Sequence, residues 1–113
     1  MPDPKYEPRD LLVTPRVFGD AIKPELRENV EMPNAKARGR ATLLQHNWAR
    51  ATKDELKRRK VRGYSQKMFA TDTGIAYQRL SRLLNGSVIL RLEDIAACEL
   101  VLGEGFYAGW MRG

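Results

Sequence analysis

The sequence has few of the residues from which disulfides and metal sites are built. Its 113 residues include one cysteine, Cys98, and one histidine, His46. A single cysteine cannot form an internal disulfide, and these two side chains are too few for a structural zinc site. We find no nucleophile beside a base and no carboxylate pair in the setting of a site. We therefore expect a non-enzymatic protein that needs no metal ion and no cofactor.

Long apolar runs are also missing. No segment approaches the roughly 18–20 apolar residues that cross a bilayer, and residues 1–8 lack the apolar stretch of a secretory signal. Hydrophobic residues make up 42% of the chain and charged residues 30%, a composition typical of folded globular proteins. We expect one cytoplasmic domain with an appended extension.

Prolines are absent after Pro33, and this divides the chain near residue 40. Because proline breaks helices, residues 1–40 are predicted to be an irregular extension, with a short strand at 11–13 and a helical turn or two within 25–32. Residues 41–113 are predicted to be the folded domain. This second part carries most of the net charge of +6, because residues 1–40 hold eight basic and seven acidic side chains. A positive balance favours partners rich in phosphate.

The proline-free part predicts four helices. Their expected ranges are 42–60, with Thr42 as N-cap, then 66–72 with Ser65 as N-cap, 76–84, and 92–102. Glycines at 63, 74, 86 and 103 are placed to end them. The residues expected in the core are Trp48, Met68, Phe69, Leu80, Leu83, Leu84, Leu92, Ile95, Ala96, Cys98 and either Leu100 or Leu102. His46 is expected on an exposed turn of the first helix.

Residues 65–86 have the spacing of a helix-turn-helix. Ala70 is small where two helices would cross at about 90–120°, and Gly74 supplies the left-handed turn residue. Ile75 and Leu80 would lock the crossing as apolar plugs. The opposite face of the third helix then presents Tyr77, Gln78, Ser81 and Arg82. Such a face fits the major groove of DNA.

This segment resembles, without a gap, the helix-turn-helix of the lambda-repressor-like, or XRE, family. The shared residues are the opening Ser65-Gln66, then Ala70 and Gly74, and the closing Leu83-Leu84-Asn85-Gly86. Residues 59–64 and 92–103 are similar to the family's first and fourth helices, so the resemblance covers about 42–103. It implies an all-α domain of four to five helices that binds double-stranded DNA. Ala76, Thr73 and Tyr77 depart from the family pattern.

The resemblance also implies roles for single residues. Gln66 would bond a phosphate and support the recognition helix, and Asn85 would contact the DNA backbone. The residues that would face bases or groove walls are Tyr77, Gln78, Arg79, Ser81 and Arg82. By their chemistry, Arg82 or Arg79 suits guanine and Gln78 suits adenine. Lys67 and basic residues of 57–62 would hold phosphates.

Two basic segments flank these residues. Residues 50–67 contain eight basic and two acidic side chains; such a run is usually a solvated helix face, but its place beside the motif favours phosphate contact. Arg38 and Arg40 precede the expected first helix. We weigh a plain linker against an arm that follows a DNA groove, and we include Arg38 and Arg40 among the candidate DNA-binding residues.

The sequence therefore predicts a sequence-specific transcriptional regulator, a repressor of bacterial, phage or mobile-element origin that acts at the nucleoid. We expect a homodimer, with residues 88–90 and 106–110 as candidate dimer surfaces. The alternative is an antitoxin or adaptor that couples the DNA-binding domain to a protein partner through residues 1–40. A non-specific DNA binder is a third possibility, against which Gln78 and Ser81 argue.

Overall fold

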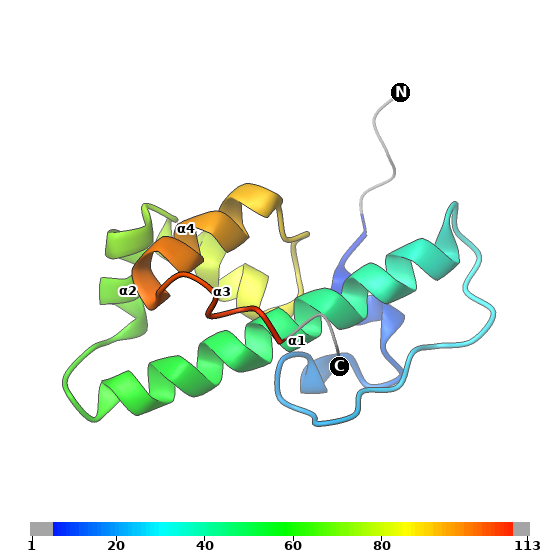
Figure 1. Cartoon of the computed structure of the whole chain (residues 1–113). Coiled ribbons are helices and arrows are strands. Elements are labelled where there is room, and N and C mark those ends of the chain that lie inside the picture. Colours follow the sequence, from blue (N-terminus) through cyan, green and yellow to red (C-terminus); the bar gives the residue numbers. More distant parts are fainter. Residues whose placement is uncertain (1–5, 110–113) are drawn as a thin grey trace.

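The described part of the chain, residues 6–109 of a computed structural model, is all-α (Figure 1). It contains two short 3-10 helices, followed by four α-helices and no β-strand. Their bounds are η1 Pro8–Leu11, η2 Pro15–Val17, α1 Ala35–Lys60, α2 Gln66–Thr73, α3 Tyr77–Asn85 and α4 Leu92–Leu102. The predicted fold class, including the irregular extension with its prolines, is confirmed. No helix in this part is long and apolar enough to cross a membrane.

Helix α1 organises the molecule. Figure 1 shows it running through the whole structure, with α2, α3 and α4 gathered along its C-terminal half and the extension around its N-terminal half. The core lies where these parts meet α1. Trp48, Phe69, Leu80, Leu83 and Cys98 are fully buried there, as the apolar spacing predicts.

The start of α1 differs from the prediction. The helix begins at Ala35 rather than at Thr42, so Arg38 and Arg40 lie in its first turns and not in a linker or arm before it. Thr42 is therefore a buried residue of the helix and not its N-cap. Gly39 lies inside this longer helix, where the absence of a side chain lets α1 approach Leu26, which would lie 3.3 Å from an added Cβ.

The extension is packed rather than loose, but its local structure also differs from the prediction. Residues 11–13 form no strand, because Leu12 makes only an isolated antiparallel bridge with Leu26. The segment 25–32 contains no helix. Backbone hydrogen bonds from Val13 to Glu25 and from Arg27 to Leu11 join the two halves of the extension into one folded-back loop.

Three predicted core residues are exposed. Met68 is 49% exposed because its sulfur accepts the Ser65 N–H at the start of α2. Leu92 opens α4 and is 84% exposed, and Ala96 lies on the outer face of the same helix. At the end of α4, Leu102 is the buried member of the predicted pair, and Leu100 is exposed.

The prediction for His46 was wrong in the opposite direction. The imidazole is completely buried between α1 and the extension. Both ring nitrogens have partners, namely the Gly19 N–H at 2.8 Å from Nδ1 and the Ala21 carbonyl at 2.7 Å from Nε2. The sequence showed a polar residue on a helix without showing the segment that would cover it.

Candidate nucleic-acid interface

Helices α2 and α3 are joined by a tight turn that the sequence predicts closely. The Ser65 hydroxyl accepts the Met68 N–H at 3.1 Å and caps α2. Gly74 ends α2 with a φ of 75°, in the left-handed region. Ile75, directly after it, is buried in the core. These three residues fix where α3 starts relative to α2.

Helix α3 is strongly two-sided. Leu80, Leu83 and Leu84 are buried, whereas Tyr77, Gln78 and Arg82 are exposed on the opposite side. The buried leucines fix the rotation of the helix about its axis. As a result, an aromatic ring, an amide and a guanidinium are presented to solvent from one rigid helix, which is the kind of surface that reads base edges.

Gln66 supports this helix from α2. Its side-chain amide donates to the Ser81 hydroxyl over 3.0 Å. The bond joins the first residue of α2 to the middle of α3, so the position of one helix depends on the other. The structure thus brings together two residues that were predicted separately as DNA contacts.

Arg79 differs from its neighbours on α3. Its guanidinium donates to the Asp94 carboxylate at 2.7 Å, and the same oxygen accepts the Arg91 N–H at 2.9 Å. Asp94 is buried at the start of α4. Arg79 therefore ties α3 to α4, which leaves Arg82 as the exposed arginine of the recognition surface. The sequence analysis did not identify Asp94 as a partner of Arg79. The signal that could have done so is an acidic residue at the third position of a predicted helix.

Asn85 closes α3 and shapes the turn after it. Its side-chain oxygen accepts from the Ser87 N–H at 3.0 Å and from the Ser87 hydroxyl at 2.7 Å. These bonds use the oxygen, so a phosphate would be met by the amide nitrogen. Asn85 is exposed, as a contact to the DNA backbone requires.

A basic groove of about 310 Å³ lies beside the recognition helix. It is bounded by the end of α1, the start of α2 and Tyr77 of α3. Its basic lining residues are Lys53, Lys57, Lys60 and Lys67. In the described part of the chain, no acidic side chain pairs with Lys57, Lys60 or Lys67. The free N–H groups at the start of α2 add partial positive charge at the same place.

Two arginines near the end of α1 already form salt bridges within the protein. Arg58 and Arg59 each donate to the Glu55 carboxylate at 2.9 Å. The hydrogen bonds from Arg59 and then Arg58 hold the pKa of Glu55 below its ordinary value. This pairing places the lysines of the groove, rather than these arginines, first among the candidate phosphate ligands.

The two remaining candidates lie elsewhere. Arg38 and Arg40 are near the start of α1, at the end of the molecule away from α2 and α3 (Figure 1). The Arg38 guanidinium lies over the Tyr6 ring, 4.9 Å from its centre. The structure therefore does not bring Arg38 or Arg40 together with the recognition helix.

Comparison with known proteins agrees with this geometry. A model of a family described as helix-turn-helix matches residues 56–107, from the second half of α1 to the segment after α4. Neither the curated proteins nor the solved structures contain a match to the chain. This part of the chain, from 56 to 107, is a helix-turn-helix domain of the lambda-repressor-like, or XRE, type, a family of DNA-binding domains.

Proposed function

We propose that the protein is a sequence-specific regulator of transcription that binds double-stranded DNA as a homodimer and acts as a repressor of bacterial, phage or mobile-element origin. DNA binding, and not catalysis, is its activity, which would place it at the nucleoid in the cytoplasm. The observation that carries this proposal is the exposed row of Tyr77, Gln78 and Arg82 on a helix whose other side is locked into the core. A non-specific binder would need only phosphate contacts.

Within this surface, each residue has a chemical role. Arg82 is the proposed guanine ligand and Gln78 the proposed adenine ligand, because each can form two parallel hydrogen bonds with that base. Tyr77 would pack against the groove wall. The basic groove, with Lys67, would hold a phosphate and set the register of the helix on the duplex.

Selection of binding sites from random duplex DNA at about 150 mM salt tests this function. We expect an enriched inverted repeat, and we expect Arg82→Ala to lose the preference at one base pair of each half-site at a cost of about 1–3 kcal/mol. Arg27→Ala is the matched control, since Arg27 is exposed but belongs to the extension. Absence of any enriched sequence, or equal loss in both variants, would contradict the proposal.

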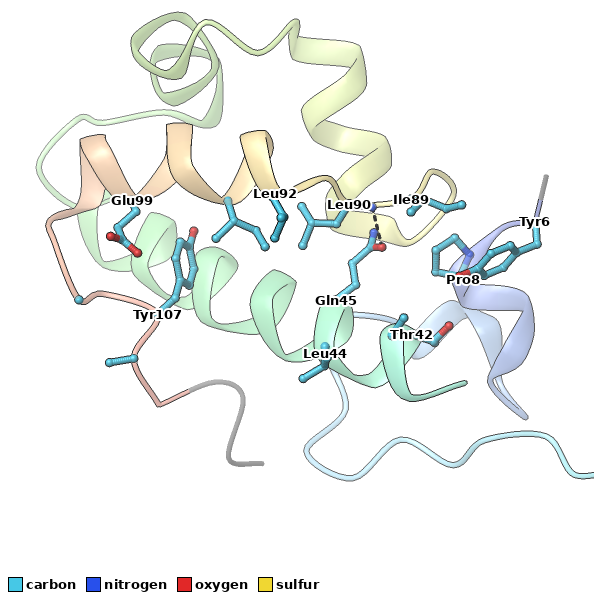
Figure 2. Close-up of a pocket in the computed structure, with 14 residues that line it drawn as sticks. Tyr6, Pro8, Thr42, Leu44, Gln45, Ile89, Leu90, Leu92, Glu99 and Tyr107 are labelled. Atoms are coloured by element: carbon cyan, nitrogen blue, oxygen red, sulfur yellow. Dashed lines mark hydrogen bonds between the residues drawn. The ribbon is translucent and has the colours of Figure 1, made fainter. Parts of the chain in front are cut away.

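The proposed dimer surface is an apolar groove of about 490 Å³ on another side of the domain (Figure 2). Figure 2 shows Ile89, Leu90 and Leu92 facing α1 across this groove, with Tyr6 and Pro8 at one end and Tyr107 at the other. Ile89 and Leu92 are exposed although they are large and apolar. This location agrees with the predicted surface at 88–90.

Two observations favour a second copy of this chain as the occupant. Among the described residues no lysine or arginine lines the groove, and Glu99 is its one charged lining residue, so two molecules with a net charge of +6 each can meet there without contacts between basic side chains. No residue of α2 or α3 lines it either, so the recognition helices stay available. For the other predicted surface, Tyr107 is buried in the core, and Trp110 lies outside the described residues.

The dimer is tested by charge substitutions on α4. Leu92→Glu places a carboxylate in the groove, whereas Leu100→Glu places one at an equally exposed position of the same helix that does not line it. Light scattering should give a monomer for Leu92→Glu and a dimer for Leu100→Glu and the unmodified protein. A monomeric unmodified protein, or the same mass for both variants, would exclude this surface.

A further inference from the structure

The extension reaches the end of the recognition helix. The ring of Phe18 is buried against Gly86, the residue that ends α3, and an added Cβ on Gly86 would lie 2.7 Å from that ring. The Arg9 N–H also donates to the Gly86 carbonyl at 3.0 Å. Two separate points of the extension therefore contact the C-terminal end of α3, although the extension precedes the matched domain in the sequence.

His46 fastens the same segment to α1. The Gly19 N–H, next to Phe18, donates to Nδ1, and the Ala21 carbonyl lies 2.7 Å from Nε2. The imidazole and the Phe18 ring are perpendicular to each other, with 5.6 Å between ring centres. Because Nδ1 accepts a hydrogen bond, the ring is neutral and carries its proton on Nε2.

We propose that His46 is a positioning residue for DNA recognition: as the neutral imidazole it holds residues 18–21 against the end of α3, and its protonation loosens this segment and weakens DNA binding. The proposal depends on the proposed DNA-binding function. It assigns to the extension the role of a brace for the recognition helix.

The chemistry of the hydrogen bonds makes the brace sensitive to acid. A proton on Nδ1 would face the Gly19 N–H, so a hydrogen bond would be replaced by two opposed donors. The charged groups that face the imidazole are Asp20 on the extension and Arg50 and Lys53 on α1. Lys53 also binds the Phe18 carbonyl at 3.3 Å and Asp20 at 3.2 Å, so the segment keeps a second attachment when the first is lost.

Burial is the main reason why the pKa of His46 is lowered from 6.5; the positive charges of Arg50 and Lys53 act in the same direction, and the Ala21 bond and Asp20 oppose them. A lowered pKa in the folded state means that the stabilisation is complete above about 6.5, the pKa in the unfolded chain. It is lost as the pH falls through the lower pKa of the folded state. The brace is therefore intact at neutral pH and is weakened only in acid.

The chain offers a clean test because His46 is its only histidine. Histidine is the side chain whose ordinary pKa places its titration between about pH 5 and 8. The dissociation constant for a selected DNA site is measured from about pH 8 to 5 for the unmodified protein and for His46→Asn, whose side-chain oxygen can accept the Gly19 N–H without titrating. We expect the unmodified protein to lose at least about tenfold in affinity on acidification and His46→Asn to lose less than about twofold.

NMR of the free protein provides the second measurement and does not depend on the variant. The Gly19 and Gly86 amide signals should shift with one common midpoint, equal to that of the His46 ring. Affinity that is independent of pH, or an equal acid loss in both proteins, would overturn the proposal. A Gly86 signal that ignores the His46 titration would do so too. An unmodified protein that binds no DNA at neutral pH would instead refute the proposed function.

Discussion

Replacement of Gly86 by alanine should destabilise the protein more than the same replacement at Gly74. Both glycines end a helix of the motif with nearly the same backbone conformation, since φ is 78° at Gly86 and 75° at Gly74. Their surroundings differ. Within 4 Å of an added Cβ there is nothing at Gly74, whereas three atoms of the Phe18 ring lie at 2.7 to 2.8 Å at Gly86.

The magnitudes separate a backbone cost from a packing cost. An alanine in the left-handed region costs about 1–2 kcal/mol at either position. The change in the unfolded chain is the same for both substitutions and cancels in the comparison. Insertion of a methyl group into a packed contact adds about 1–3 kcal/mol at Gly86 alone. We therefore expect a loss of about 1–2 kcal/mol for Gly74→Ala and about 2–5 kcal/mol for Gly86→Ala.

Urea unfolding followed by circular dichroism measures both losses. Phe18→Ala supplies the second arm of a double-mutant cycle, because removal of the ring should reduce the cost of Gly86→Ala to that of Gly74→Ala. Equal losses for the two single glycine variants would refute the reasoning. They would mean that the extension does not press on the end of α3 in solution, and the proposed brace would lose its structural basis.

Three further outcomes follow from the described contacts. Asp94→Asn should lower the free energy of unfolding by about 1–3 kcal/mol, because it weakens the charged partner of Arg79, and Glu93→Gln, at an exposed position, should change it little in the same urea experiment. Burial raises the pKa of Cys98 to about 12, so the native thiol should not react with a disulfide reagent at about pH 8 and should react fully in urea. Lys60→Gln should reduce the slope of log affinity against log salt by about one unit; an unchanged slope would remove this lysine from the phosphate contacts.

The helix-turn-helix could be predicted because its determinants are local. Ser65 caps a helix that starts at the next residue, and Gly74 ends that helix, so both act within a few positions of the chain. The alternation of exposed Gln78 and Arg82 with buried Leu80 and Leu83 likewise follows from the helical repeat alone. For such residues, the sequence contains nearly all of the physical information that decides their place.

The errors arose where a distant segment decides the environment. His46 is buried by residues that precede it by 25 and 27 positions, and nothing in its own helix indicates that cover. Glycine is a poor helix former, yet Gly39 lies inside α1, where its lack of a side chain allows the close contact with Leu26. The family resemblance placed Arg79 among the residues that face bases or groove walls, but a carboxylate on the next helix binds its guanidinium.

The folded extension also bears on the alternative function of residues 1–40. A partner that captured this segment as an unfolded peptide would first have to break the His46 bonds and withdraw Phe18 from Gly86. It would thereby remove the support of the recognition helix, so capture and DNA binding would oppose each other. A partner that strengthens DNA binding must instead bind the extension as it is folded here. The exposed Val13 and Ile22 are apolar side chains that such a partner could contact without disturbing the brace. The sign of the coupling between partner and DNA would therefore reveal which form of the extension the partner recognises.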